Sequence, residues 1–227
     1  MEYLTETLIP YVTMLLPVLL DGLKITLWIS AFAFALGVVL GALLAIIRYF
    51  KVKGLTTLIK IYISYFRGTP LLIQLFLFYY GLPIVIEPLQ RCPKQLALII
   101  CLGLNSAAYI SESIRGAIES VEHGQFEASV AFGLSKIQMM IHIILPQAAV
   151  AAIPPIVNSC MDIIKMSSIG MTIGIQDIMG EAQLKAATHY KTFETYILAA
   201  AIYWVVSIIL GYLQKRVEKT VNTAYEK

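Results

Sequence analysis

Two sets of polar residues lie within apolar stretches of this sequence, and each set is spaced so that its side chains share one face of a helix. Both sets occupy positions i, i+4 and i+7, and they are Asn105, Tyr109 and Glu112 in the first and Asn158, Asp162 and Lys165 in the second. Amide, phenol, carboxylate and ammonium groups placed in this way can hydrogen-bond or ion-pair with a polar solute. Polar groups within an apolar helix usually point into the bundle or into a wet cavity. The two faces, with the neighbouring Met166, therefore predict a path for a polar substrate.

No part of the sequence has a pattern that could catalyse a reaction. It contains no GxxxxGK[ST] phosphate-binding loop, no HExxH zinc motif and no GxSxG nucleophile elbow. The three cysteines, Cys92, Cys101 and Cys160, lack the spacing of metal ligands. We therefore expect no catalytic residue, no metal site and no cofactor on this chain.

The composition is that of a membrane protein. Of the 227 residues, 59% are hydrophobic and 14% are charged, with a mean hydropathy of +0.78, whereas soluble domains are about 25% charged. A span needs about 20 mostly apolar residues. Five segments qualify once their weakly polar flanks are included: Tyr11–Tyr49, Leu71–Ile86, Leu96–Ile110, Ala148–Ile164 and Tyr196–Leu213. We predict an all-α membrane protein with about five transmembrane helices. The net charge of +3 suits basic loops at a membrane surface and does not indicate nucleic acid as a partner.

The first apolar segment contains two features that bear on its helix. Pro10 and Pro17 are expected to interrupt it, so that the first transmembrane helix starts near Asp21. Farther along, Gly37 and Gly41 have the GxxxG spacing that lets two helix backbones approach closely in a membrane. We therefore expect this part of the helix to pack tightly against another.

The distribution of Lys and Arg predicts the orientation, because these residues accumulate in cytoplasmic loops. The basic residues gather in the first connection (Arg48, Lys51, Lys53, Lys60) and in the C-terminal tail (Lys215, Arg216, Lys219, Lys227). Both regions are expected in the cytoplasm, while the N-terminus with Glu2 and Glu6 is expected outside. An outside start and an inside finish require an odd number of spans, and five satisfies this. The same count places residues 120–146 in the cytoplasm.

The segment Glu127–Pro146 interrupts the apolar sequence with the amphipathic block EASVAFGLSKIQMMIHIILP. Its pattern is Glu127-Ala128-Ser129, then Gly133, Ile143 and Leu145-Pro146. It resembles the "EAA" loop of permease subunits in bacterial ATP-binding cassette (ABC) importers, with Ser129 in place of a second alanine. The resemblance implies that residues 120–146 form a coupling loop that docks a short helix on a separate ATP-hydrolysing subunit. The implied coupling residues are Glu127, Ala128, Gly133, Leu145 and Pro146.

Two further blocks resemble the permeases that carry polar amino acids. Arg67–Gln74, RGTPLLIQ, is similar to their RGTPLL-Q element, and Gly103–Gly116 is similar to their GLxxxAYxxExxRG run. Together the resemblances cover about residues 22–218. They imply the type I ABC importer transmembrane fold, a single permease domain over residues 1–227, and a place in the bacterial cytoplasmic membrane. They also imply two ATPase subunits that bind ATP and magnesium, a second permease subunit and an extracytoplasmic solute-binding protein.

Three of the charged side chains have two interpretations each. Arg67 could anchor the chain at phosphate headgroups or pair with Glu112 on another helix. Glu112 could line the substrate path or simply pair with Arg115, three residues away. Asp162 could contact the ammonium group of an amino acid, or it could only neutralise Lys165.

The function implied is that of a membrane-spanning importer subunit for a polar amino acid, not an enzyme in itself. The alternative is an ATP-independent channel or assembly subunit, although a channel has no need of an exposed docking helix. A basic amino acid, glutamine and cystine all remain open as substrates, as does the choice between a homodimer and a heterodimer.

Overall fold

A computed structural model describes residues 8–225 of the chain, in which every regular element is helical. The predictions that involve Glu2, Glu6 and Lys227 fall outside the described residues. The α-helices are α1 (Ile9–Tyr49), α2 (Leu55–Gly68), α3 (Leu71–Phe76), α4 (Leu82–Val85), α5 (Lys94–Glu119), α6 (His123–Ala131), α7 (Lys136–Met139), α8 (Leu145–Met166), α9 (Ile178–His189) and α10 (Thr192–Tyr225). Short π-helical turns (Leu77–Gly81, Met140–Ile144) and 3₁₀ turns (Glu87–Arg91, Ser167–Ile173) join some of them.

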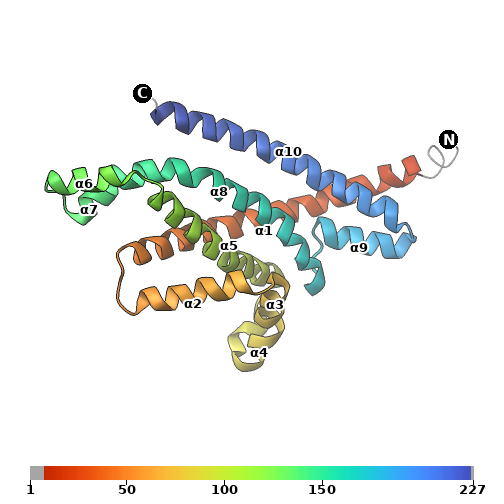
Figure 1. Cartoon of the computed structure of the whole chain (residues 1–227). Helices are drawn as coiled ribbons and strands as arrows, with labels where there is room; N and C mark the ends of the chain where they lie inside the picture. The colour runs from red at the N-terminus through yellow and green to blue at the C-terminus, as the bar shows by residue number, and fades with distance from the viewer. Residues whose placement is uncertain (1–7, 226–227) are drawn as a thin grey trace.

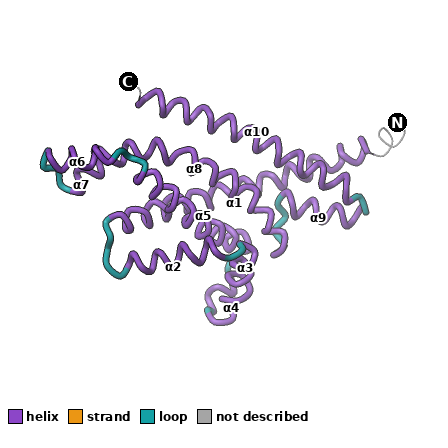
Figure 2. The backbone as a smooth tube through the Cα atoms, in the orientation of Figure 1, coloured by secondary structure: helices purple, strands orange, loops and turns teal. Residues whose placement is uncertain are grey.

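The prediction of about five transmembrane helices is confirmed. Four helical segments are long and apolar enough to cross a membrane: Ile9–Tyr49, Lys94–Glu119, Lys136–Ile173 and Thr192–Thr220. A fifth span is formed if α2 and the α3–α4 segment are taken together, since they pass the same test as a pair bent by 110°. The break between them lies at Thr69-Pro70, within the Arg67-Gly68-Thr69-Pro70 sequence, and it is visible as a short loop beside α3 (Figure 2).

The expected interruption near Pro10 and Pro17 is wrong, because α1 runs without a break from Ile9. Pro10 lies in the first turn, where no backbone N–H donor is needed, and Pro17 lies within the helix with its ring exposed. On the opposite face Leu15 and Leu19 are fully buried and pack in one apolar cluster with residues of α9 and α10. This packing holds the helix together despite the lost hydrogen bond.

Close contact at the GxxxG spacing is confirmed, and it joins α1 to α5. A β-carbon on Gly37 would come within 2.3 Å of the Ser106 hydroxyl, and one on Gly41 within 2.8 Å of Ile110. Larger side chains at either position would push the helices apart. Since α5 carries the first polar set, this contact fixes its position relative to α1.

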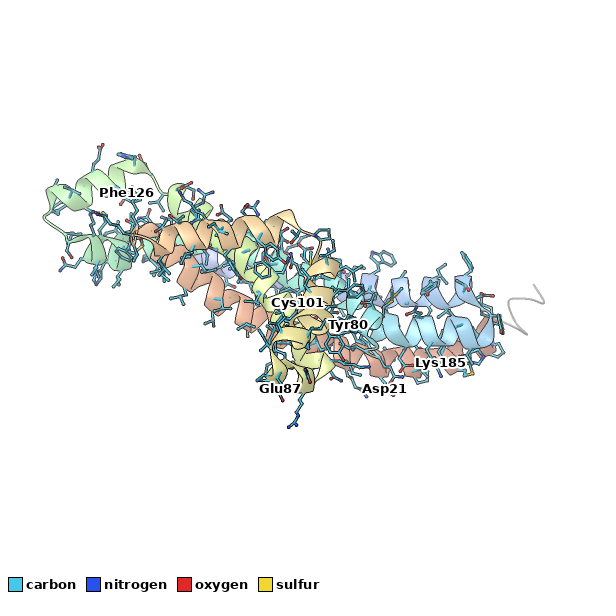
Figure 3. All side chains as sticks on the ribbon, turned by 90° about the horizontal axis from the view of Figure 1, so that it is seen from below. Asp21, Tyr80, Glu87, Cys101, Phe126 and Lys185 are labelled. Carbon is cyan, nitrogen blue, oxygen red and sulfur yellow. The ribbon has the colours of Figure 1, made fainter. Side chains whose placement is uncertain are left out.

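The molecule is elongated, and several of its connections gather at its two ends, while α3 and α4 project from its middle (Figure 1). One end holds the α1–α2 connection, α6, α7 and the C-terminal part of α10. The other holds the start of α1 and the whole of α9. In the view from below, Phe126 of α6 and Lys185 of α9 lie at opposite ends (Figure 3). Between them, a core cluster draws buried residues from α1, α3, α5 and α8, among them Ile29, Leu75, Leu98 and Ile163.

Candidate functional site

The break between α2 and α3 is held by two buried amides. The Gln74 side-chain nitrogen donates to the carbonyls of Phe66 and Thr69, each at 3.0 Å. The Asn105 side-chain nitrogen donates to the Phe66 carbonyl at 3.1 Å and to the Gln74 amide oxygen at 3.0 Å. Backbone carbonyls freed by a helix break need such partners inside a membrane. Asn105 therefore stabilises the bent span, and its part in a substrate path stays a prediction.

Glu112 lies at the centre of an ion-pair cluster that joins three helices. Its carboxylate pairs with Arg48 of α1, with Arg67 of α2 at 3.9 Å and with Arg115 of its own helix at 2.8 Å. The Glu112 side chain is only 18% exposed. Both pairings expected for it, with Arg67 and with Arg115, are present, and the partner on α1 was not predicted. Its charge is thus balanced by arginines of the chain itself, and its part in a substrate path stays a prediction.

Tyr109, one turn before Glu112, is more open. Its side chain is 41% exposed, and the Arg67 guanidinium carbon lies 5.5 Å from the centre of its ring. This distance is suited to a cation–π contact. Tyr109 thus borders the arginine cluster on one side and keeps a free surface on the other.

The second polar set lies on an exposed face of α8. Asn158, Asp162, Lys165 and Met166 are all exposed, with Met166 at 38%. The Asp162 carboxylate oxygen forms an ion pair with the Lys165 ammonium nitrogen at 2.8 Å, and both side chains remain more than half exposed. In contrast to Glu112, this pair is local to one helix and leaves room for another partner. A shared cavity of the α5 and α8 residues stays a prediction.

The residues predicted to couple to an ATPase subunit are distributed over α6, the turn that follows it and the start of α8. Glu127 and Ala128 lie on exposed faces of α6, and the Glu127 carboxylate is 3.2 Å from the His123 ring nitrogen. Gly133 has a φ of +74° in the turn that ends α6, and an added β-carbon would meet no atom within 4 Å. Glycine is favoured there because of the backbone conformation and not because of packing inside this chain.

Two large apolar side chains beside Gly133 point away from the rest of the chain. Val130 is 68% exposed and Phe132 is 86% exposed. After the turn, Ser135 and Gln138 form a reciprocal capping box that starts α7. We call the segment from α6 to α7 (His123–Met139) the predicted coupling block. It has a capped second helix and an exposed apolar tip.

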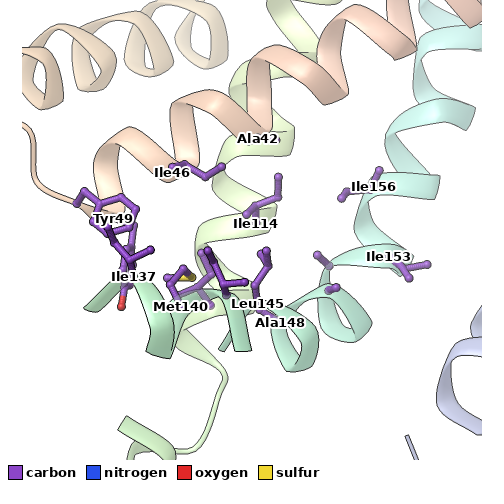
Figure 4. A pocket seen from close by; sticks show the side chains of 15 residues that line it. Ala42, Ile46, Tyr49, Ile114, Ile137, Met140, Leu145, Ala148, Ile153 and Ile156 are labelled. Atoms are coloured by element: carbon purple, nitrogen blue, oxygen red, sulfur yellow. The ribbon is translucent and has the colours of Figure 1, made fainter. Parts of the chain in front are cut away.

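An apolar pocket of about 490 Å³ separates this block from α1 (Figure 4). It is lined by Ile46, Ile114, Met140 and Ile156, together with Leu145 of the coupling motif. The residues predicted for the substrate path are absent from its lining. Leu145 and the adjacent Pro146, in the first turn of α8, thus connect the coupling block to a bundle that is loosely filled at this point.

Asp177 is a buried acidic residue that sequence reasoning missed. It is fully buried, caps the start of α9 by accepting from the Gly180 backbone N–H at 2.9 Å, and accepts a long hydrogen bond from the Thr26 hydroxyl of α1. Burial raises the pKa of Asp177 to about 6. An aspartate followed by a helical pattern signals a cap, but nothing in the sequence signals its burial.

Comparison with known proteins identifies the family. Over residues 37–223 the chain matches the family described as binding-protein-dependent transport system inner membrane component. The chain belongs to this family, and it is a multi-pass protein of the bacterial inner membrane.

Individual relatives show which kind of transport protein within this family the chain resembles. The chain is 41% identical to the "Probable amino-acid ABC transporter permease protein PatM" of Vibrio harveyi, over 95% of this chain and 96% of that protein. It is 37% identical to the "Arginine transport system permease protein ArtQ" of Bacillus subtilis, over 92% and 94%. A solved structure, "Crystal structure of an amino acid ABC transporter with histidines", is 32% identical with a TM-score of 0.87, covering 95% and 99%. The resemblance to an amino-acid ABC importer permease, and to its type I fold, is confirmed.

Proposed function

We propose that this chain is the subunit through which a polar amino acid crosses the inner membrane, with the energy supplied by ATP hydrolysis on a separate subunit. The observation that carries the proposal is the coupling block. It combines an exposed helix, a glycine-dependent turn and an exposed Phe132 at one end of a bundle with no nucleotide-binding motif of its own.

The coupling block has the features that a docking element needs. Phe132 and Val130 offer an apolar anchor that this chain leaves uncovered. Glu127 offers a carboxylate that is 73% exposed, for a cation on the partner. Because α8 begins directly after the block, a displacement of the block reaches the exposed polar face of α8 through Leu145 and Pro146.

The proposed assembly contains two ATPase subunits, a second permease subunit and an extracytoplasmic solute-binding protein. The basic α1–α2 connection and the coupling block share one end of the molecule, as a common cytoplasmic side requires (Figure 1). Accordingly, in a variant without native cysteines, a cysteine at position 136 should react with an impermeant thiol reagent only after the cells are opened. A cysteine at position 185 should react in intact cells.

The substrate is proposed to be an amino acid whose ammonium or side-chain cation contacts Asp162. ArtQ is named as an arginine transport permease and the solved relative is described with histidines, whereas a protein of Rickettsia felis that is 38% identical to this chain is named as a putative glutamine transport permease. The names of the relatives therefore support a polar amino acid and leave basic amino acids and glutamine both open. The Asp162 side chain is more than half exposed, and within the described residues it forms an ion pair only with Lys165 of its own helix. A bound cation would supply a second, opposite charge to this carboxylate.

Coupling can be tested with the complete complex reconstituted in vesicles. Gly133→Asp should leave the protein in the membrane but abolish substrate-stimulated ATP hydrolysis, since a bulky residue at this φ distorts the docking turn. Gly124→Asp is the matched control, because Gly124 lies in the first turn of α6 with ordinary helical backbone, where an acidic residue is favourable. Normal stimulation in the Gly133 variant would contradict the role given to this turn, and a lack of substrate-stimulated hydrolysis in the unaltered complex would favour the ATP-independent channel instead.

A further inference from the structure

A cationic hollow lies between the end of α1 and the start of α2. Its volume is about 480 Å³, and its lining includes Arg48, Lys51, Lys53 and Lys60. No acidic residue occurs in the sequence between Arg48 and Lys60. The loop that forms the hollow is the long connection between α1 and α2 in Figure 2. The hollow therefore concentrates positive charge at one end of the molecule.

The three lysines of this hollow lack an internal counterion. Arg48 is already paired with Glu112 and is only 15% exposed. By contrast, Lys51, Lys53 and Lys60 are exposed and take part in none of the ion pairs formed within the described part of the chain. An uncompensated cluster of this kind attracts an anion from outside the chain.

The first turn of α2 adds to the positive potential of the hollow. Gly54, Thr56 and Thr57 line it. This helix of 14 residues has neither a side-chain cap nor an acidic residue in its first turn, so the positive end of its dipole is not offset locally.

An apolar stripe runs along α2 directly beside the hollow. Leu58, Ile61 and Tyr65 stand at i, i+3 and i+7, and they are 63%, 61% and 42% exposed. Exposed apolar side chains of a membrane helix contact acyl chains, whereas a docking site for a soluble protein does not require such a stripe. Cationic and apolar surfaces next to each other match the two parts of one phospholipid.

We propose that the hollow binds the headgroup of an anionic phospholipid of the cytoplasmic leaflet, with its acyl chains along the Leu58–Tyr65 stripe. Lys51, Lys53 and Lys60 donate hydrogen bonds to the phosphate oxygens and neutralise their charge. Lysine on a long, flexible stem suits this role, because it meets the phosphate as a point charge and needs no fixed geometry. The site ties the basic loop to the membrane surface independently of transport.

The test uses the unaltered full chain in vesicles that contain spin-labelled phosphatidylglycerol or phosphatidylcholine. We expect a preference for phosphatidylglycerol that weakens with rising salt. Replacing Lys51, Lys53 and Lys60 together by Gln should lower this preference by about fivefold for each lysine that contacts the lipid. The charge-conserving Lys51→Arg, Lys53→Arg and Lys60→Arg variant should keep it.

The controls separate this site from general charge effects. Replacing Lys215, Arg216 and Lys219 by Gln removes three cations from α10, and it should leave most of the preference intact. An equal loss in that control, or a salt-insensitive preference in the unaltered protein, would overturn the proposal. So would displacement of the lipid by inorganic phosphate at matched ionic strength, which would indicate a site for free anions.

If the triple lysine variant kept its lipid preference but lost affinity for the ATPase subunit, the loop would be a protein contact. None of these readouts depends on transport, so failure here leaves the proposed function untouched.

Discussion

The polar faces of α5 and α8 have the same spacing in the sequence and opposite environments in the structure. On α5, Asn105 and Glu112 meet partners from other helices and are largely buried. On α8, Asp162 meets only a neighbour on its own helix and remains exposed. Polar residues within membrane helices thus serve two purposes here. The set on α5 holds the bundle together, and the set on α8 can contact a ligand or another protein outside this chain.

The comparison predicts its largest effect at Glu112. Glu112→Gln removes the single carboxylate shared by Arg48, Arg67 and Arg115, leaving guanidinium groups of three helices without their common partner. Breaking a buried ion pair from one side costs about 3–5 kcal/mol. We expect a marked fall in the apparent melting temperature of the detergent-solubilised protein. Glu119→Gln is the control, because Glu119 is 64% exposed and pairs with Arg115 alone. Equal melting of the two variants would contradict the role given to the cluster.

Asp177 extends the comparison, because it is fully buried and takes part in none of the ion pairs within the described residues. Its pKa is raised to about 6 by burial, above the ordinary value for aspartate of about 3.9. A raised carboxyl pKa means that the folded protein holds its proton more tightly than the unfolded chain. The ionised form therefore destabilises the fold at neutral pH by an amount on the order of 3 kcal/mol. This penalty should be relieved as the pH falls from about 6 toward 4.

The prediction for Asp177→Asn follows from the same argument. The Asn amide can still cap α9 and can donate to the Thr26 hydroxyl, without a charge to bury. We expect a higher melting temperature at pH 7 and a flatter dependence on pH between 7 and 5 than in the unaltered protein. A variant that melts lower at pH 7 would show that the ionised Asp177 carboxylate stabilises the fold, and an unchanged pH dependence would show that another group is responsible for it.

A smaller effect is expected at Asn105. Asn105→Ala deprives the Phe66 carbonyl and the Gln74 amide of one partner each, and an unsatisfied buried polar group costs about 1–3 kcal/mol. Loosening of the α2–α3 break should be measurable as faster hydrogen exchange around residues 66–74. Ser113→Ala is the matched control on α5, because the Ser113 hydroxyl bonds only to the Tyr109 carbonyl of its own helix. Unchanged exchange in the Asn105 variant would contradict its structural role.

The sequence was sufficient for the features that depend on local pattern. Hydropathy predicted about five spans, and the Gly37–Gly41 spacing predicted a tight helix contact, because both arise from residues close together in the chain. Features that depend on distant packing were missed. The Pro17 region stays helical because α9 and α10 cover its other face. The Arg48–Glu112 pair joins residues 64 positions apart, which periodicity cannot relate.

The smallest effect on stability and the largest consequence for transport are predicted at Asp162. Because the Asp162–Lys165 pair is exposed and lies within one helix, its loss should cost at most about 1 kcal/mol. Asp162→Asn should therefore leave assembly and basal ATP hydrolysis unchanged. If the carboxylate binds the substrate cation, the half-saturating concentration for uptake of a basic amino acid should rise at least about tenfold, since hydrogen bonds to charged groups contribute about 1.5–3 kcal/mol. Lys165→Met, made alone, should not weaken uptake in this way.

If Asp162 only neutralises Lys165, Asp162→Asn should instead assemble poorly with its partner subunits, and the double variant with Lys165→Met should assemble normally again. Lost assembly with unchanged transport affinity would place α8 with α5, as a face that holds the bundle together.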